Sequence, residues 1–162
     1  MSQEPPNEAQ RARISKTAVW VAAARAIGAR EPDLSVRNPD DLATVLLGNP
    51  SDLHVVHPIV TALGLNYDDA MQDLETVGLV RAMIIRTRFI DEALERAMAR
   101  GVTQVLILGA GLDSHAYRFR QLLSGARVFE LDRPATLEYK QRRVAEALGG
   151  VPGNLTYVPM DL

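Results

Sequence analysis

The most restrictive feature of this sequence is a short apolar run that ends in a glycine turn. Residues 103–108 read Thr-Gln-Val-Leu-Ile-Leu, and Gly109-Ala110-Gly111 follows at once. Continuous apolar runs of this length are typical of parallel strands that are buried on both faces. A glycine turn that leads from such a strand into a helix opens a doubly wound α/β sheet. We therefore predict a parallel sheet that starts at this run.

The rest of the chain continues the alternation of helix and strand. The pattern predicts a helix over 113–123, a strand over 127–131, a helix over 134–148 and a strand over 155–159. Only three strands are predicted, whereas complete doubly wound sheets of this kind have about six. We therefore expect residues 101–162 to be the first half of an α/β domain, and the chain to be a fragment or a truncated form of a longer protein.

The residues before this sheet are predicted to be helical. Residues 15–30 are rich in alanine, and residues 73–100 have the strongest helical periodicity. A second helix is expected from Asn38, with Asn38 as N-cap and Pro39 at the first helical position, to about residue 47. A shorter element is expected over 57–65. The sequence thus predicts a helical N-terminal region over 13–100, preceded by a disordered tail over 1–12.

Composition excludes several classes of function. The formal net charge of −2 provides no basic field for nucleic acid or an anionic membrane. The sequence has no cysteine, so disulfides and thiolate metal sites are excluded, and its three histidines have no carboxylate at a recognised ligand spacing. No metal site is therefore expected. The first residues lack the order of a signal peptide and no apolar run could span a bilayer, so we expect a cytoplasmic protein.

The turn itself is expected to face a ligand, because ligands in such folds bind beyond the carboxyl ends of the strands. Gly109 permits the tight turn, Gly111 lets a ligand approach the backbone, and Asp113 or Ser114 caps the next helix. A dinucleotide fingerprint would have a third glycine where Ser114 stands, and Asp113 is poorly placed beside a diphosphate. A cationic, phosphate-free nucleoside such as S-adenosylmethionine suits this turn better.

The other two strand ends also carry acidic residues. Glu130 and Asp132 follow the glycine turn at about the twenty-residue spacing of a ribose-binding acid, and both point to the same side of a strand. Either could accept hydrogen bonds from ribose, although Asp132 lies further out. Asp161 at the third strand end could accept from an adenine amino group, and Leu162 could pack against the ring.

These motifs resemble the leucine carboxyl methyltransferase family, in its mycobacterial type, over roughly residues 14–162. The resemblance is carried by Arg86-Thr87-Arg88-Phe89-Ile90-Asp91, Gly109-Ala110-Gly111-Leu112-Asp113-Ser114-His115-Ala116-Tyr117-Arg118, Phe129-Glu130-Leu131-Asp132-Arg133-Pro134 and Asp161-Leu162. The family often has arginine where His115 stands and aspartate where Asn38 stands.

The resemblance implies a Rossmann-like class I methyltransferase fold and S-adenosylmethionine as cofactor. It implies that Gly109, Ala110 and Gly111 face the amino-acid part of the cofactor, and that Arg86 pairs with its carboxylate. It also assigns the ribose to Asp132 and the adenine to Asp161 and Leu162. Arg25 is a further candidate to assist Arg86.

The predicted function is O-methylation of a small molecule or a carboxylate. No catalytic residue is assigned, because an ionised oxygen acceptor needs no general base. Two alternatives stay open: a truncated, non-catalytic fragment and a nicotinamide-dependent oxidoreductase. The sequence does not indicate the methyl acceptor or the oligomeric state.

Overall fold

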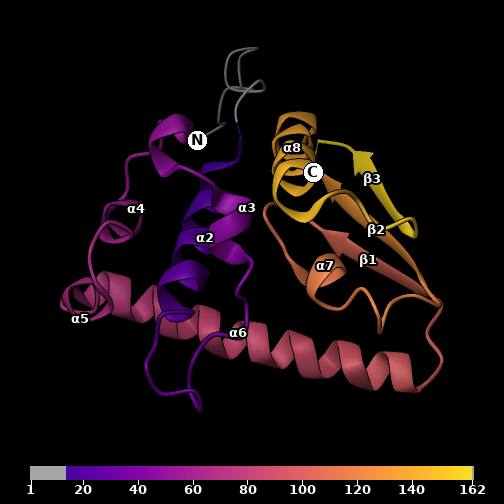
Figure 1. Cartoon of the computed structure of the whole chain (residues 1–162), viewed down its shortest axis with the longest axis horizontal. Coiled ribbons are helices and arrows are strands. Elements are labelled where there is room, and N and C mark those ends of the chain that lie inside the picture. The colour runs from indigo at the N-terminus through magenta and orange to yellow at the C-terminus, as the bar shows by residue number, and fades with distance from the viewer. Residues whose placement is uncertain (1–13, 162) are drawn as a thin grey trace, which may run out of the picture.

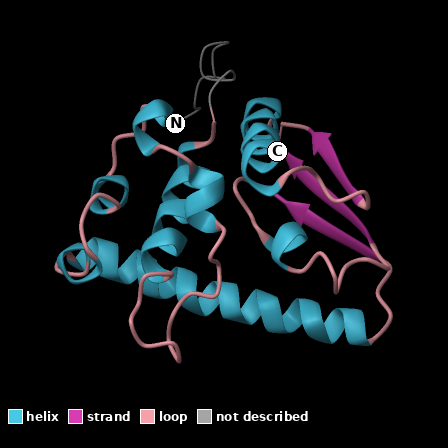
Figure 2. Cartoon of the chain, in the orientation of Figure 1, coloured by secondary structure: helices cyan, strands magenta, loops and turns pink. Residues whose placement is uncertain are grey.

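A group of helices lies beside a three-stranded sheet in the computed structural model of this chain, which describes residues 14–161 (Figures 1 and 2). The predicted tail over 1–12 lies outside the described residues. The elements, in chain order, are α2 Lys16–Gly28, α3 Ala43–Leu47, η1 Pro50–Leu53, α4 Pro58–Ala62, α5 Tyr67–Ala70, α6 Leu74–Ala99, β1 Gln104–Leu108, α7 His115–Arg118, β2 Arg127–Asp132, α8 Pro134–Leu148 and β3 Leu155–Pro159.

Helix α2 is the central element of the helical part. Its N-cap is Ser15, whose side chain accepts a hydrogen bond from the amide of Ala18. The helix packs against α3, α4 and α6, and four alanines along it are fully buried: Ala22, Ala23, Ala24 and Ala26. These small side chains let neighbouring helices approach α2 from several directions. The expected helix over 15–30, buried on much of its surface, is therefore confirmed.

The long helix α6 also agrees with its prediction. Asp73 caps its start by accepting a hydrogen bond from the amide of Thr76 at 2.7 Å. Gly101 follows its end with a φ of +81°, a conformation that glycine adopts without strain. In Figure 1 this helix runs beneath both the helical part and the sheet. It can therefore contribute side chains to a site between the two.

The predicted helix from Asn38 to about residue 47 is wrong in its first half. Asn38 Oδ1 accepts a hydrogen bond from the amide of Asp40, and Asp40 Oδ1 accepts one from the amide of Leu42. These side chains occupy backbone donors in successive turns, and such local bonds compete with a helix. Helix α3 therefore begins at Ala43, without a side-chain cap.

The predicted helix over 113–123 is also too long, because α7 ends at Arg118 and turns follow. Leu123 is carried into the core, where it is 1% exposed. The side-chain amide of Asn154 donates hydrogen bonds to the carbonyls of Leu123 and Ala126. This contact comes from a distant part of the chain and stabilises the turns in place of a longer helix.

The sheet has the order β1-β2-β3, and both strand pairs are parallel. The predictions for β2, α8 and β3 are confirmed. The expectation that β1 is buried on both faces is wrong, because Leu106 and Leu108 are 59% and 67% exposed. Helix α8 packs against β2 and β3 from the other side, where Lys140 reaches Glu130.

The helical part is joined to the sheet at both ends of α2. The amide of Ser15 donates a hydrogen bond to Thr136 Oγ1 at the start of α8, at 3.2 Å. Near the other end, the guanidinium of Arg25 donates to the carbonyl of Leu112 in the glycine turn, at 2.7 Å. Helix α2 is therefore fixed above the carboxyl ends of β1 and β2, which is where a ligand would be bound.

Candidate functional site

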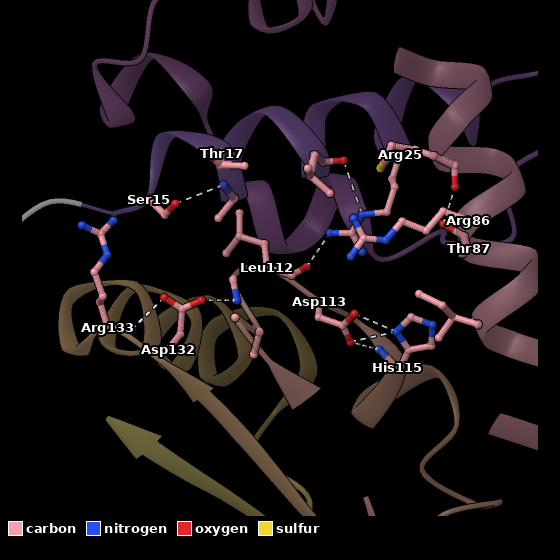
Figure 3. A pocket seen from close by; sticks show the side chains of 17 residues that line it. Ser15, Thr17, Arg25, Arg86, Thr87, Leu112, Asp113, His115, Asp132 and Arg133 are labelled. Carbon is pink, nitrogen blue, oxygen red and sulfur yellow. Dashed lines mark hydrogen bonds and ion pairs between the residues drawn. The ribbon is translucent and has the colours of Figure 1, made fainter. Parts of the chain in front are cut away.

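A pocket of about 360 Å³ lies between α2, α6 and the carboxyl ends of β1 and β2. Figure 3 shows Asp132 and Arg133 at one end of it and Arg25 and Arg86 at the other. The residues that line it are Ser15, Thr17, Ala18, Val21 and Arg25 from the first helix, Met83, Arg86, Thr87 and Ile90 from α6, and Gly109, Ala110, Gly111, Leu112, Asp113, His115, Asp132 and Arg133 from the sheet side. Five of the predicted site residues therefore come together.

The two glycines of the turn have different roles. Both adopt left-handed backbone conformations, with φ of +61° at Gly109 and +48° at Gly111. A Cβ at Gly109 would meet no atom within 4 Å, so this glycine leaves open space. A Cβ at Gly111 would lie 2.9 Å from the Cβ of Ala18. The missing Cβ of Gly111 thus lets α2 approach the turn closely, and a ligand contact at this glycine stays a prediction.

The carboxylate of Asp132 fixes the turn from the neighbouring strand. Its Oδ2 accepts a hydrogen bond from the amide of Gly111 at 2.7 Å, and its Oδ1 accepts one from the amide of Arg133 at 2.7 Å. Each carboxylate oxygen can accept a second hydrogen bond. Asp132 lines the pocket and therefore keeps acceptor capacity that faces a ligand.

Glu130, the other candidate for the ribose, lies beneath the pocket. It is fully buried and accepts a hydrogen bond from the fully buried Lys140 at 2.5 Å. Burial raises the pKa of Glu130 to about 7, although Lys140 opposes this effect. Glu130 is absent from the residues that line the pocket. Of the two acids, Asp132 is therefore the one that a ligand in the pocket can reach.

The two arginines at the far end of the pocket differ in their partners. Arg25 is 6% exposed, and it donates to Asp40 Oδ2 at 2.6 Å and to the carbonyl of Leu112 at 2.7 Å. Arg86 is exposed and has no hydrogen bond or ion pair with any residue that the structure describes. Arg25 is therefore committed to the protein, and Arg86 is available to a ligand.

The buried His115 belongs to an ionic network that sequence reasoning did not identify. Its Nδ1 lies 2.8 Å from both oxygens of Asp113, and its Nε2 lies 3.0 Å from Asp91 Oδ1 on α6. Burial alone would lower the pKa of His115, but the hydrogen bond to Asp113 and the ion pair with Asp91 raise it to about 9. Burial raises the pKa of Asp113, but the hydrogen bond and the charge of His115 outweigh this effect. The pKa of Asp113 is therefore well below its ordinary value. The imidazolium therefore links the glycine turn to α6.

Arg118 extends this network towards α2. Its guanidinium donates to both oxygens of Asp91, and its Nε lies 3.9 Å from Asp40 Oδ1. Asp40 in turn binds Arg25. Positive and negative groups alternate along this line, which joins α2, α6 and the turn after β1. The spacing of these residues in the sequence gave no signal for the network, because its members are brought together by the tertiary fold.

The remaining predicted residues lie elsewhere. Asp161 is exposed beyond β3 and does not line the pocket, and Leu162 lies outside the described residues. Among residues 14–161, no group of histidine and acidic side chains could hold a metal ion. No helix in this part of the chain is long and apolar enough to cross a membrane. The adenine contacts of Asp161 and Leu162 stay predictions.

Known proteins that resemble this chain are named as proposed S-adenosyl-L-methionine-dependent methyltransferases. One from Mycolicibacterium vanbaalenii is 34% identical over 164 residues, covering 92% of this chain and 48% of the relative. One from Streptomyces coelicolor is 37% identical over 124 residues, covering 76% of this chain and 40% of the relative. One from Mycobacterium marinum is 36% identical over 152 residues, with coverages of 92% and 48%. The chain spans about half the length of the curated relatives it matches.

The family model for leucine carboxyl methyltransferases matches residues 18–162, a range that includes every element from α3 to β3 and nearly all of α2. The match thus covers all three walls of the pocket. The fold of this family is Rossmann-like, in agreement with the parallel sheet and its glycine turn. This chain belongs to the leucine carboxyl methyltransferase family.

Proposed function

We propose that this chain forms the cofactor-binding part of an S-adenosylmethionine-dependent methyltransferase, which methylates an oxygen of a small molecule or a carboxylate. The observation that carries this proposal is the placement of Arg86 and Asp132 at opposite ends of one pocket, with the glycine turn between them. S-adenosylmethionine is an amino acid joined to a nucleoside. The guanidinium of Arg86 matches the carboxylate at its amino-acid end, and the carboxylate of Asp132 matches the ribose hydroxyls at its nucleoside end.

Arg86 would hold the carboxylate of the cofactor. A guanidinium presents two parallel N–H donors to a carboxylate, which fixes its orientation as well as its position. Arg25 lies nearby, but both of its terminal nitrogens already donate to Asp40 and Leu112. Arg25 therefore positions the turn in this proposal, and Arg86 makes the contact with the ligand.

Asp132 would hold the ribose, and the turn would face the amino-acid part. The oxygens of Asp132 can each accept one more hydrogen bond, which suits two neighbouring hydroxyl groups. Gly109 leaves open space beside its Cα, so a ligand can approach the backbone there. The volume of about 360 Å³ falls within the usual range for small-molecule sites.

The same contacts disfavour a nicotinamide dinucleotide. A diphosphate at this turn would need backbone amides and a helix N-terminus. The amide of Gly111 already donates to Asp132, and the amide of His115 donates to Asp113 Oδ1 at 2.8 Å. Two carboxylates therefore occupy the donors that a diphosphate would use, and their charge would repel it.

In the proposed mechanism, bound S-adenosylmethionine supplies a methyl group on a positively charged sulfur. The residues of this chain bind and orient: Arg86 fixes one end, Asp132 fixes the other, and the turn sets the position between them. Orientation of this kind lowers the entropic cost of an in-line displacement. An ionised oxygen acceptor needs no proton removed, so no general base is required.

Isothermal titration with S-adenosylhomocysteine and with NAD⁺ tests the cofactor. We expect heat from S-adenosylhomocysteine, loss of most of that heat in Arg86→Gln, and unchanged heat in Arg100→Gln, which alters an exposed arginine at the end of the same helix. Heat from NAD⁺ alone would contradict the proposal. If millimolar S-adenosylhomocysteine neither gives heat nor raises the melting temperature, this chain is a non-catalytic fragment.

The acceptor is tested by the chemistry of its product. The name of the family supports a carboxylate, because it specifies methylation of a carboxyl group. Methyl esters are hydrolysed in mild alkali and release methanol, whereas methyl ethers are stable. Transfer from S-adenosylmethionine with a radioactive methyl group, followed by alkali, should therefore release volatile label if the acceptor is a carboxylate.

A further inference from the structure

The imidazole of His115 bridges two walls of the pocket. Its Nδ1 lies 2.8 Å from both oxygens of Asp113, which follows the glycine turn, and its Nε2 lies 3.0 Å from Asp91 Oδ1 on α6. The amide of Asp113 donates to the carbonyl of Ala110 at 2.7 Å, so the position of Asp113 is tied to that of the turn. Figure 3 shows His115 and Asp113 at the same end of the pocket as Arg86. The ring therefore lies between the turn and the helix that carries Arg86.

Asp91 is the polar contact of α6 with the sheet side. The helix itself packs mainly against α2 and α4. Among residues 14–161, Asp91 is the only residue of α6 with a hydrogen bond or an ion pair to the chain that follows the helix. Both of its partners, His115 and Arg118, come from α7. Asp91 lies little more than one helical turn after Arg86, so these contacts also set the distance between Arg86 and the glycine turn.

Both contacts of the ring need a proton on the nitrogen concerned, because an ionised carboxylate only accepts hydrogen bonds. A neutral imidazole has one N–H, and its other nitrogen presents a lone pair. In the neutral ring, either Asp113 or Asp91 would face that lone pair, which repels a carboxylate. Only the imidazolium satisfies the turn and α6 at the same time. The raised pKa of His115, about 9, agrees with this geometry.

The charges around His115 balance when its ring is protonated. The largely buried network then holds three acids and three bases: Asp113, Asp91 and Asp40 with His115, Arg118 and Arg25. From β2, Glu130 also interacts with the charge of His115, and Glu130 is paired with Lys140 on α8. The ring of Phe119 stacks beside the imidazole and adds no charge. Loss of the proton therefore leaves this network with an excess of negative charge.

We propose that His115 is a positioning residue of the cofactor site. As an imidazolium, it holds the glycine turn and α6 at the separation at which the turn and Arg86 contact the same ligand. The neutral ring releases one of the two walls, so the site then binds its cofactor more weakly. This inference rests on the proposed function, because it takes S-adenosylmethionine as the ligand that spans the two walls. His115 acts through Asp113 and Asp91.

The ring of His115 itself reports this coupling. If the cofactor prefers the protonated form, the bound cofactor must raise the pKa of His115 by a matching amount, because coupling between two binding events is reciprocal. NMR titration of the histidine rings, with and without saturating S-adenosylhomocysteine, measures both values. We expect a pKa of about 9 in the free chain and a higher pKa in the complex.

The control His54→Gln makes the same substitution at an exposed histidine. It should leave the titration of His115 and the affinity for S-adenosylhomocysteine unchanged. The chain has three histidines, so this variant also helps to assign the resonances.

Titration calorimetry at about pH 8 and about pH 10 measures the coupling as an affinity. The dissociation constant of the unaltered chain for S-adenosylhomocysteine should rise by at least about threefold more than that of His115→Arg. In His115→Arg a cation with several N–H donors is present at both pH values, so this variant shows only the titration of the ligand's own amino group. His115→Gln should bind more weakly at the lower pH, and its affinity should then follow the profile of His115→Arg.

The outcomes separate this inference from the proposed function. A pKa of His115 that bound S-adenosylhomocysteine leaves unchanged or lowers would overturn the positioning role, although the cofactor site would stand. Coinciding profiles of the unaltered chain and His115→Arg, with both binding, would do the same. If a His115 variant does not fold, the NMR titration of the unaltered chain decides. If S-adenosylhomocysteine binds at neither pH, the proposed function fails and this inference fails with it.

Discussion

Asp132 at the end of β2 holds the amide of Gly111 in the turn after β1, with 2.7 Å between Oδ2 and the nitrogen. The acid predicted to bind ribose is therefore also part of the frame that shapes the turn. A ligand bound to this carboxylate contacts a group whose orientation is already fixed by two backbone amides. This arrangement reduces the side-chain ordering that binding would otherwise require.

Replacing Asp132 should therefore affect both binding and the turn. We expect Asp132→Ala to weaken S-adenosylhomocysteine binding by about 1–3 kcal/mol, the usual cost of an unpaired buried hydrogen-bonding group. Titration calorimetry measures this, with Glu138→Ala as a control at an exposed acid on α8. Unchanged affinity in Asp132→Ala would contradict the ribose contact.

The two glycines of the turn should respond differently to alanine. Gly109→Ala adds backbone strain of about 1–2 kcal/mol, because the φ of Gly109 is +61°. It adds no steric overlap, because a Cβ at Gly109 would meet no atom within 4 Å. Gly111→Ala adds similar strain and also places a Cβ 2.9 Å from that of Ala18. The extra overlap should cost about 1–3 kcal/mol more. Urea unfolding of both variants measures the difference.

A double-mutant cycle then isolates the contact with α2. Ala18→Gly alone should cost about 1 kcal/mol, the usual effect of glycine inside a helix. Combined with Gly111→Ala it should recover part of the loss, so that the two changes are not additive. Strict additivity would show that the overlap is relieved by movement of α2.

The ion pair between Arg25 and Asp40 should matter far more than an exposed pair. Asp40 is fully buried and Arg25 is 6% exposed, so Asp40→Ala leaves a buried cation without its main partner. We expect a loss of about 3–5 kcal/mol in the free energy of unfolding. Glu92→Ala, which removes the exposed partner of Arg96, should change it by less than about 1 kcal/mol.

Stability should fall as the pH rises through the titration of His115. The pKa of His115 is about 9 in the folded chain and near its ordinary value of 6.5 in the unfolded chain. The folded state therefore holds this proton more tightly, and the stabilisation is complete below about pH 6.5 and lost through pH 9. The total effect is on the order of 3 kcal/mol.

A matched variant separates this effect from that of Glu130. The pKa of Glu130 is raised to about 7, so its ionisation also lowers stability, between about pH 4.5 and 7. His115→Gln should flatten the profile from pH 7 to 9. Chemical denaturation at each pH gives the two profiles. A slope above pH 7 that survives in His115→Gln would assign the proton to another group.

The elements that the sequence predicted correctly are those determined by local pattern. Examples are the periodicity of α6, the proline at the start of α8 and the apolar residues of β1. Each of these signals depends only on residues close together in the sequence. One of the errors occurred where a distant contact decides, because Asn154 stabilises the turns after α7 from the loop before β3.

The site was predictable in part for the same reason. The glycine turn and Asp132 follow from strand ends, which meet at one edge of any parallel sheet. Arg86 came from the family resemblance, and it lines the pocket, where its contact with a cofactor stays a prediction. The network of Asp91, Arg118 and His115 could not be predicted, because ion pairs between separate elements leave no periodic trace in a sequence.

The attachment of α2 at both ends has a consequence for how quickly a ligand exchanges. Ser15 is held by Thr136 on α8, and Arg25 is held by Leu112 in the turn. The helix cannot swing outward as a unit unless both contacts break. A bound molecule therefore meets a wall that is already fixed at both ends, and its residence time depends on its own contacts with the pocket.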